Sequence, residues 1–246
     1  MADNGLRVLK LVTNWGEREL HYADPNNKLR PAIQDILSGK AYPATARPQG
    51  YVLDTIVDVG ANIGASALHF LTQTPRRMIC FEPSAENYGF LKQNLTGLAN
   101  VETYQFGLFS RDCDVPLYTG RHQQMQNSVI KSIETGDAYE TIKLRRASSV
   151  LSELNVDRIS VLKIDTEGCE VPILNDIAAM LPRVDMLYLE YHSEQDRRDI
   201  DTMLAAGFIL ATAEAKCPHR GVNLYLAKRM VDGVPIYGAM ALPRPN

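Results

Sequence analysis

Residues 55–70, TIVDVGANIGASALHF, constrain the fold of this chain more than any other segment. A short apolar run, residues 56–59, leads directly into a glycine turn and then into an amphipathic helix. Gly60 opens the turn and Gly64 begins the helix, and glycine at both positions allows a sharp bend and the close approach of a ligand. The helix start offers N–H groups and partial positive charge to an anion. The segment therefore predicts a strand–turn–helix unit with a ligand site at the turn.

The spacing of the glycines distinguishes between two kinds of nucleoside cofactor. A dinucleotide fingerprint, G-x-G-x-x-G, requires glycine at positions that hold Asn62 and Ala65, so it fails twice. The pattern D-x-G-x-x-x-G, from Asp58 to Gly64, is instead the pattern that methyltransferases show at this turn. The anion is then the methionine carboxylate of S-adenosylmethionine. A tight structural turn without a ligand is the alternative.

An acidic residue ends the second predicted strand. Glu82 closes MICFEP eighteen residues after Gly64, where a carboxylate can accept both ribose hydroxyls of a nucleoside. The carboxyl ends of neighbouring strands form the ligand edge of an open α/β sheet. The predicted cofactor residues are Asp58, Gly60, Ala61, Asn62, Gly64, Glu82, Pro83, Gly107 and Asp165.

Apolar periodicity beyond residue 55 predicts alternating strands and helices. The predicted strands are residues 56–59, 78–81, 101–109, 159–165, 186–191, 208–213 and 222–227. The predicted helices follow the glycine turn and occupy residues 84–97, 148–154, 170–181 and 197–206. Crossover helices between strands imply a mostly parallel sheet covered on both faces. The last two strands have no helix between them and predict an antiparallel edge hairpin, so the fold class is α/β and Rossmann-like.

We divide the chain into an N-terminal helical or irregular extension, residues 1–50, and a main domain, residues 51–246. The extension contains one predicted helix at residues 29–38, with Pro31 in its first turn. Weak alternation without a helical face predicts a β-rich insertion at about residues 110–146. We expect the extension and the insertion to wall the acceptor site.

Composition excludes several classes of partner. A formal net charge of -3 gives no basic excess, so no nucleic-acid partner is predicted. No run has the length of a membrane span, and the N-terminus lacks the apolar core of a secretory signal. None of the four cysteines forms a C-x-x-C pair, which favours reduced thiols and a cytoplasmic location. A homo-oligomer is compatible with the sequence.

Two later strands carry the candidate catalytic groups. LKIDTEGCE contains Lys163, Asp165 and Glu167 at alternate positions, which share one face of a strand. LYLEYHSE places Glu190 and His192 in the same way. We predict His192 or Asp165 as general base, Lys163 as the group that tunes Asp165, and Glu167 and Glu190 as substrate-binding residues. The same side chains can also ligate a divalent cation, so a metal is left open and is not predicted.

As an ordered set these motifs resemble those of the FkbM-type methyltransferases. The resemblance rests on VDVGANIGASALHF, FEPSAENYGFLKQNL, LKIDTEGCEVPIL and LEYHSE, with the lead-in DILSGKAYP upstream. It implies a class I methyltransferase that moves a methyl group from S-adenosylmethionine to a hydroxyl oxygen of a small molecule, such as a sugar, a macrolide or another secondary metabolite. One position departs from the family, because Ala147, Ser148 and Ser149 stand where similar proteins carry acidic residues.

Two other functions are compatible with the same residues. A methyltransferase-like module that binds the nucleoside cofactor without turnover would keep the glycine turn and Glu82. A nicotinamide-dependent oxidoreductase is less consistent with the sequence because the second fingerprint glycine is missing. The identity of the acceptor does not follow from the sequence.

Overall fold

The computed structural model describes residues 5–26, 28–45, 47–120, 135–217 and 219–231. Seven strands form one central sheet in the order β11-β12-β10-β9-β3-β4-β5. β10, β9, β3, β4 and β5 are parallel, and β12 runs antiparallel to both β10 and β11. The predicted parallel sheet with an antiparallel edge hairpin is therefore confirmed. The strand bounds are β3 Thr55–Val59, β4 Arg77–Phe81, β5 Val101–Tyr104, β9 Ile159–Ile164, β10 Val184–Tyr191, β11 Phe208–Cys217 and β12 Arg220–Ala227.

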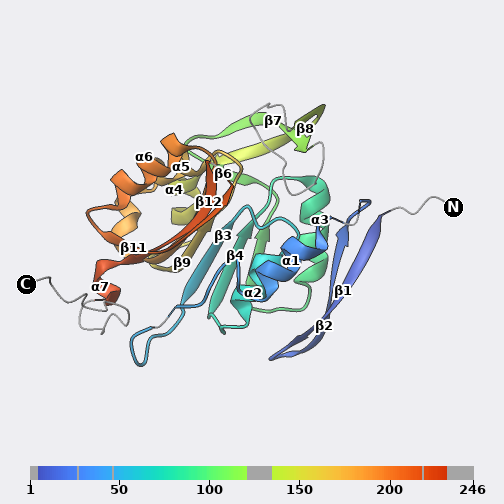
Figure 1. Cartoon of the computed structure of the whole chain (residues 1–246), viewed down its shortest axis with the longest axis horizontal. Helices are drawn as coiled ribbons and strands as arrows, with labels where there is room; N and C mark the ends of the chain where they lie inside the picture. The colour runs from blue at the N-terminus through green and yellow to red at the C-terminus, as the bar shows by residue number, and fades with distance from the viewer. Residues whose placement is uncertain (1–4, 27, 46, 121–134, 218, 232–246) are drawn as a thin grey trace, which may run out of the picture.

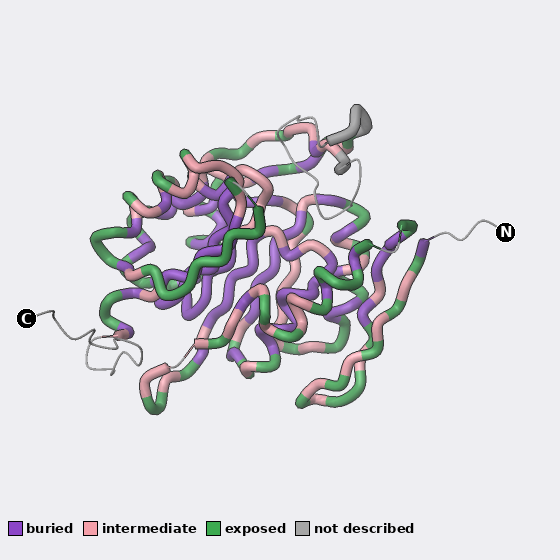
Figure 2. The backbone as a smooth tube through the Cα atoms, viewed as in Figure 1, coloured by how far each residue is buried: buried purple, intermediate pink, exposed green. Residues whose placement is uncertain are grey.

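Helices cover both faces of this sheet (Figure 1). One face carries α1 (Arg30–Leu37), α2 (Ala65–Leu71) and α3 (Ala85–Asn94). The other carries α4 (Ala147–Glu153), α5 (Glu170–Asp176) and α6 (Glu194–Leu204). Alternate strand residues point to opposite faces, so Ile56 packs with the first set and Val57 with the second. Every residue of β3, β9 and β10 is buried, as expected of strands covered on both faces (Figure 2).

The N-terminal segment differs from its prediction. A two-stranded antiparallel hairpin, β1 (Leu6–Thr13) and β2 (Gly16–Ala23), occupies residues that we expected to be helical or irregular. The hairpin is fixed to α3, because the Asn94 side chain accepts from the backbone N–H of His21 at 2.8 Å and donates to its carbonyl at 2.9 Å. The predicted helix at residues 29–38 is confirmed as α1. The domain boundary near residue 50 stays a prediction.

The β-rich insertion forms as predicted in its described part. β7 (Cys113–Gly120) pairs antiparallel with β8 (Thr135–Arg146), and residues 121–134 of the predicted insertion lie outside the described residues. The predicted strand at residues 101–109 is divided, however. Its first half is β5, whereas β6 (Gly107–Phe109) joins β8 and β7 in a separate sheet. At the start of β6, Gly107 packs on Leu144 and Pro83, and a Cβ atom there would require the Leu144 side chain to shift.

Two predicted helices differ at their ends. The helix predicted at residues 170–181 ends as α5 at Asp176 and continues as a 3-10 helix, Ala178–Arg183, which contains Pro182. α6 begins before the predicted residue 197, because Ser193 caps it by accepting from the Asp196 N–H at 3.0 Å. The chain ends its described part in α7 (Lys228–Val231).

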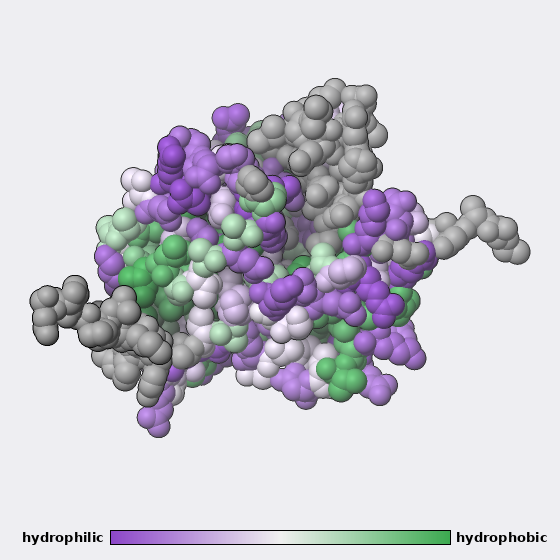
Figure 3. All heavy atoms as spheres, viewed as in Figure 1, coloured by the Kyte–Doolittle hydropathy of each residue, from purple (hydrophilic) through white to green (hydrophobic). Residues whose placement is uncertain are grey.

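The surface is mostly polar on the face drawn in Figure 3. Apolar residues gather there over β11, where Leu210 is half exposed. Within the described part of the chain, no helix combines the length and the hydropathy that crossing a bilayer requires.

Candidate active site

The carboxyl ends of β3, β4, β9 and β10 open into one cleft of about 490 Å³, a size typical of sites for small molecules and cofactors. Ten of the predicted site residues line it: Gly60, Ala61, Asn62, Glu82, Pro83, Gly107, Lys163, Asp165, Glu167 and Glu190. The other three, Asp58, Gly64 and His192, are not among the described residues that line it. The cleft therefore brings the two predicted motif regions together.

The glycine turn is held tightly against the end of β9. Gly60 has a φ of 78°, and a Cβ atom there would overlap the carbonyl oxygen of Asp165. The backbone N–H groups of Gly60 and Ala61 both donate to the carbonyl of Phe81, at 3.0 Å each. The N–H groups of the turn are thus already engaged. Ala65 and Ser66, the first residues of α2, line the cleft, and the first N–H groups of a helix have no acceptor within the helix.

Glu82 is fixed beside this turn. Its carboxylate accepts from the N–H of Asn62 at 2.8 Å and from the N–H of Ser84 at 2.9 Å. Burial raises the pKa of Glu82 to about 7, although these two donors partly offset the effect. Each carboxylate oxygen retains a second lone pair, so the group can still accept from a ligand in the cleft.

Lys163 pairs mainly with Asp58 and only secondarily with Asp165, the partner that its i, i+2 position suggested. Its ammonium lies 2.9 Å from Asp58 Oδ1 and 3.8 Å from Asp165 Oδ2. It also donates to the carbonyl of Gly60 at 2.9 Å. Burial acts to lower the pKa of Lys163, but the charges of Asp58 and Asp165 outweigh it and raise the pKa. Asp58 is fully buried and also accepts from the Ser66 hydroxyl at 2.6 Å. It therefore stabilises the turn from its buried side, and its role as a direct cofactor contact stays a prediction.

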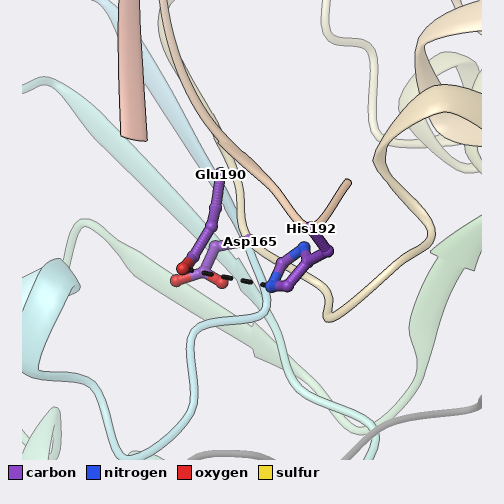
Figure 4. Close-up of side chains that lie close together, drawn as sticks. All are labelled: Asp165, Glu190 and His192. Carbon is purple, nitrogen blue, oxygen red and sulfur yellow. Dashed lines mark ion pairs between the residues drawn. The ribbon is translucent and has the colours of Figure 1, made fainter. Parts of the chain in front are cut away.

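Asp165 and Glu190 face each other across the ends of β9 and β10 (Figure 4). Burial acts to raise the pKa of Asp165, but Lys163 and a hydrogen bond shared with Glu190 hold it well below its usual range. Burial and the charge of Asp165 raise the pKa of Glu190 to about 8. The two carboxyl groups therefore hold one proton between them at neutral pH. Lys216 of β11 lies 3.1 Å from Glu190.

His192 belongs to an ion-pair cluster below the cleft. Its Nε2 lies 3.1 Å from Glu167 Oε2, and its Nδ1 lies 3.5 Å from Glu170 Oε1. Burial acts to lower the pKa of His192, but the negative charges of the two glutamates raise it to about 11. Neither ring nitrogen has a hydrogen-bond partner of good geometry among the described residues. A protonated imidazole cannot accept a further proton, so the raised pKa bears on the choice of base, and the role of His192 as general base stays a prediction.

Asp165, Glu190 and His192 could together hold a cation by distance alone. Their nearest ligand atoms lie within 4.8 Å of one another, and His192 Nε2 is 3.9 Å from Glu190 Oε1 (Figure 4). A metal needs a neutral imidazole, however, and Glu167 and Glu170 favour the protonated ring. The charges around His192 thus favour a proton at this position.

Several residues of the site were not predicted. Glu170 stabilises the loop at residues 166–168, because its carboxylate accepts hydrogen bonds from the N–H groups of Thr166 and Gly168 at 2.8 and 3.0 Å. Arg220 of β12 donates to Glu167, and Tyr42 donates to Asp165 Oδ2 at 3.1 Å. The sequence signal for Glu170 was its place in LKIDTEGCE. Tyr42 lies in the DILSGKAYP lead-in, which the family resemblance included without a role.

The parallel sheet, the glycine turn and the acidic end of the next strand define a Rossmann-like methyltransferase. The chain belongs to the FkbM methyltransferase family: the Methyltransferase FkbM domain matches residues 58–210, more than half of its length. The resemblance drawn from the sequence is therefore confirmed, together with the Rossmann-like fold and the methyltransferase class.

Three curated relatives illustrate this membership. The methyltransferase sdnD of Sordaria araneosa is 30% identical over 68% of this chain and 77% of its own length. The hexuronic acid methyltransferase AglP of Haloferax volcanii is 26% identical, with 62% of each chain covered. The AMB antimetabolite synthetase AmbE of Pseudomonas aeruginosa is 28% identical over 69% of this chain, which spans only 10% of AmbE.

A solved structure supports the fold. The FkbM methyltransferase from Methylobacillus flagellatus KT superposes with a TM-score of 0.51 at 18% identity. The match covers 71% of this chain and 43% of that one.

Proposed function

We propose that this methyltransferase uses S-adenosylmethionine to methylate a hydroxyl oxygen of a small polar molecule, either a sugar or a secondary metabolite. The observation that carries the proposal is the single cleft that joins the glycine turn and Glu82 to the Asp165–Glu190 pair. The names of two relatives are consistent with it, since AmbE is an antimetabolite synthetase and AglP a hexuronic acid methyltransferase.

The lining residues fit S-adenosylmethionine. The N–H groups of Ala65 and Ser66 suit the methionine carboxylate, and Glu82 suits the two ribose hydroxyls. Gly107 and Pro83, with Leu117, Ile142 and Leu144 of the inserted sheet, give an apolar wall beside Glu82 for the adenine. Asp165 packs directly on Gly60, so its carboxylate would be the group beside the turn that faces the positive sulfonium.

When bound, S-adenosylmethionine would supply an activated methyl group: the acceptor oxygen forms a bond to the methyl carbon in line with the breaking C–S bond, and S-adenosylhomocysteine is the leaving group. The chain then has two tasks. It orients the acceptor, for which Glu167, Lys216 and Arg220 line the cleft. It also removes the hydroxyl proton, for which we propose the Asp165–Glu190 pair in place of His192. Lys163 keeps the turn in place and Asp165 ionised.

Titration calorimetry tests the cofactor. We expect micromolar binding of S-adenosylmethionine and S-adenosylhomocysteine and no binding of NADH. A folded, ligand-free sample that binds neither sulfur compound would contradict the proposal and favour a module without this cofactor, whereas NADH binding would favour the oxidoreductase.

An acceptor screen with hexuronic acids, neutral sugars and macrolides follows, with the methylated atom identified by NMR. Transfer to nitrogen or carbon would refute the hydroxyl assignment.

The affinity for S-adenosylmethionine is expected to depend on the ionisation of Glu82. Its pKa is raised to about 7, so the carboxylate form that accepts both hydroxyls is present above pH 7 and is lost as the pH falls. Glu82→Gln should weaken binding roughly 10- to 100-fold at pH 8 and remove the pH dependence. Calorimetry between pH 6 and 8.5 measures both effects. The control is Glu102→Gln, a strand carboxylate paired with Arg77 outside the cleft. Equal pH dependence in the Glu82 variant and the wild type would exclude this role.

Turnover is expected to rise with pH through about 8. Glu190 has its pKa raised to that value, so the carboxyl pair can accept a proton only above it. Glu190→Gln should lower kcat by about 10²–10⁴-fold and flatten the profile. His192→Gln removes a positive charge that lowers the pKa of Glu190, so the profile should move to higher pH and keep its shape. A profile that becomes flat with His192→Gln and not with Glu190→Gln would return the base role to the histidine.

A further inference from the structure

Tyr42 is one of the residues of the N-terminal segment that line the cleft. Its side chain is buried, and its hydroxyl lies 3.1 Å from Asp165 Oδ2. Burial and the charge of Asp165 raise the pKa of this phenol well above its usual value, so the hydroxyl acts as a donor. The bond joins residues 123 positions apart in the chain, and neither motif of the site contains Tyr42.

The ring of Tyr42 is held from two sides. It packs on Phe70 and Tyr188, with centroid distances of 5.7 and 5.6 Å. The loop that carries it is fixed by His69 Nε2, which lies 2.9 Å from the Tyr42 carbonyl. The Tyr188 hydroxyl donates to the carbonyl of Pro43 at 2.6 Å. The tyrosine hydroxyl is therefore presented to Asp165 by a rigid support.

Lys163 makes no hydrogen bond to Asp165, because its ammonium is engaged by other acceptors. The ammonium contacts Asp58 and the Gly60 carbonyl at 2.9 Å each, but remains 3.8 Å from Asp165. That separation gives Coulomb attraction without a hydrogen bond. The single ammonium of Lys163 thus faces two carboxylates, those of Asp58 and Asp165. Its charge does not neutralise both, so the Asp165 carboxylate presents net negative charge to the cleft. The Tyr42 hydroxyl lies at hydrogen-bonding distance from Asp165 Oδ2, and Glu190 shares a further hydrogen bond with the same carboxylate.

We propose that Tyr42 is a positioning residue whose hydroxyl holds the Asp165 carboxylate toward the sulfonium of S-adenosylmethionine, so that the site recognises the positive charge of the cofactor. The inference rests on the proposed function. It gives the lead-in segment a role in the cofactor site. It also predicts that the Asp165 carboxylate interacts with the positive sulfur of S-adenosylmethionine, which is a neutral thioether in S-adenosylhomocysteine.

Comparing a charged and a neutral ligand distinguishes this role from a purely structural one. Calorimetry gives the Kd of S-adenosylmethionine, which is charged at sulfur, and of S-adenosylhomocysteine, which is not. The ratio of the two Kd values measures how strongly the site recognises the charge. Tyr42→Phe keeps the ring and its packing. It should weaken the sulfonium ligand about three- to tenfold and leave the neutral ligand within about twofold. Asp165→Asn should shift the ratio about tenfold in the same direction. In the double variant, Tyr42→Phe with Asp165→Asn, the change in the Kd ratio should be smaller than the product of the two single changes, because both substitutions act through one carboxylate.

Tyr188→Phe is the matched control. It removes a buried hydroxyl from the same aromatic cluster and loosens the same loop, but its hydroxyl bonds to Pro43 and not to Asp165. The ratio should stay at the wild-type value in this variant. An unchanged ratio in Tyr42→Phe, or an equal loss of both ligands, would overturn the proposal. A wild-type protein that binds neither ligand would instead refute the cofactor assignment itself, and this outcome is visible before any variant is made.

Discussion

Replacing Lys163 by methionine is expected to lower the free energy of unfolding by about 3–5 kcal/mol, because the change leaves a buried carboxylate without its counter-charge. Asp58 is fully buried and Lys163 is 2% exposed, and their charged atoms lie 2.9 Å apart. Methionine matches the length of the lysine stem, so packing contributes little to the loss. Urea unfolding monitored by circular dichroism measures the difference.

Two further variants test whether the loss of stability comes from the unpaired buried charge. Lys163→Met with Asp58→Asn should recover much of the loss, since the fully buried carboxylate is then neutral; Asp165, which is partly exposed, still lacks the ammonium 3.8 Å away. Lys40→Met removes an ion pair of similar length, 3.0 Å to Asp35, whose side chains are 65% and 50% exposed. It should cost less than about 1 kcal/mol. Similar losses for Lys163→Met and Lys40→Met would show that burial does not make the inner pair important.

Gly60→Ala is expected to abolish measurable binding of S-adenosylmethionine and to destabilise the fold by about 2–5 kcal/mol. Two effects add at this position. The φ of 78° is strained for any residue with a Cβ atom, and that atom would overlap the Asp165 carbonyl oxygen. Relief requires the turn and the end of β9 to separate, which displaces Asp165 and the Lys163 contact with Gly60. Calorimetry and thermal unfolding measure the two consequences.

Gly50→Ala separates backbone strain from overlap. Gly50 has a φ of 76°, but a Cβ atom there would meet no described atom within 4 Å. This variant should lose only about 1–2 kcal/mol and should bind the cofactor as the wild type does. If Gly60→Ala behaved like Gly50→Ala, the contact between the turn and β9 would not matter for the cofactor site.

The strands of the central sheet could be predicted from the sequence because each one is marked by residues that are neighbours in the chain. Continuous apolar runs such as ISVLKI and the turn glycines mark strands and crossovers without any long-range contact. The β1–β2 hairpin escaped this reasoning. In LRVLKLVT, apolar residues fall on both faces of the strand, with Val8 and Val12 exposed and Leu9 and Leu11 partly buried, so no period of two is visible.

The partners within the site could be predicted only in part, because they depend on which strands are neighbours. The spacing of Lys163 and Asp165 suggested a pair within one strand. The register of β3 against β9 instead sets Asp58 directly beside Lys163. His192 was predicted from its place at a strand end, whereas its charge state depends on Glu167 and Glu170, which come from the preceding crossover. Tyr42 carried no periodic signal at all.

The pairing of β3 with β9 also has a consequence for biosynthesis. While the ribosome is still adding the first half of the chain, β3, β4 and β5 are complete, but the strand that will lie on the other side of β3 does not yet exist. Asp58 has no counter-ion in that nascent chain, and burying it alone is costly. Stable closure of the sheet therefore waits until Lys163 has left the exit tunnel, and the cleft is assembled late in folding, as parallel sheets with distant strand pairs require.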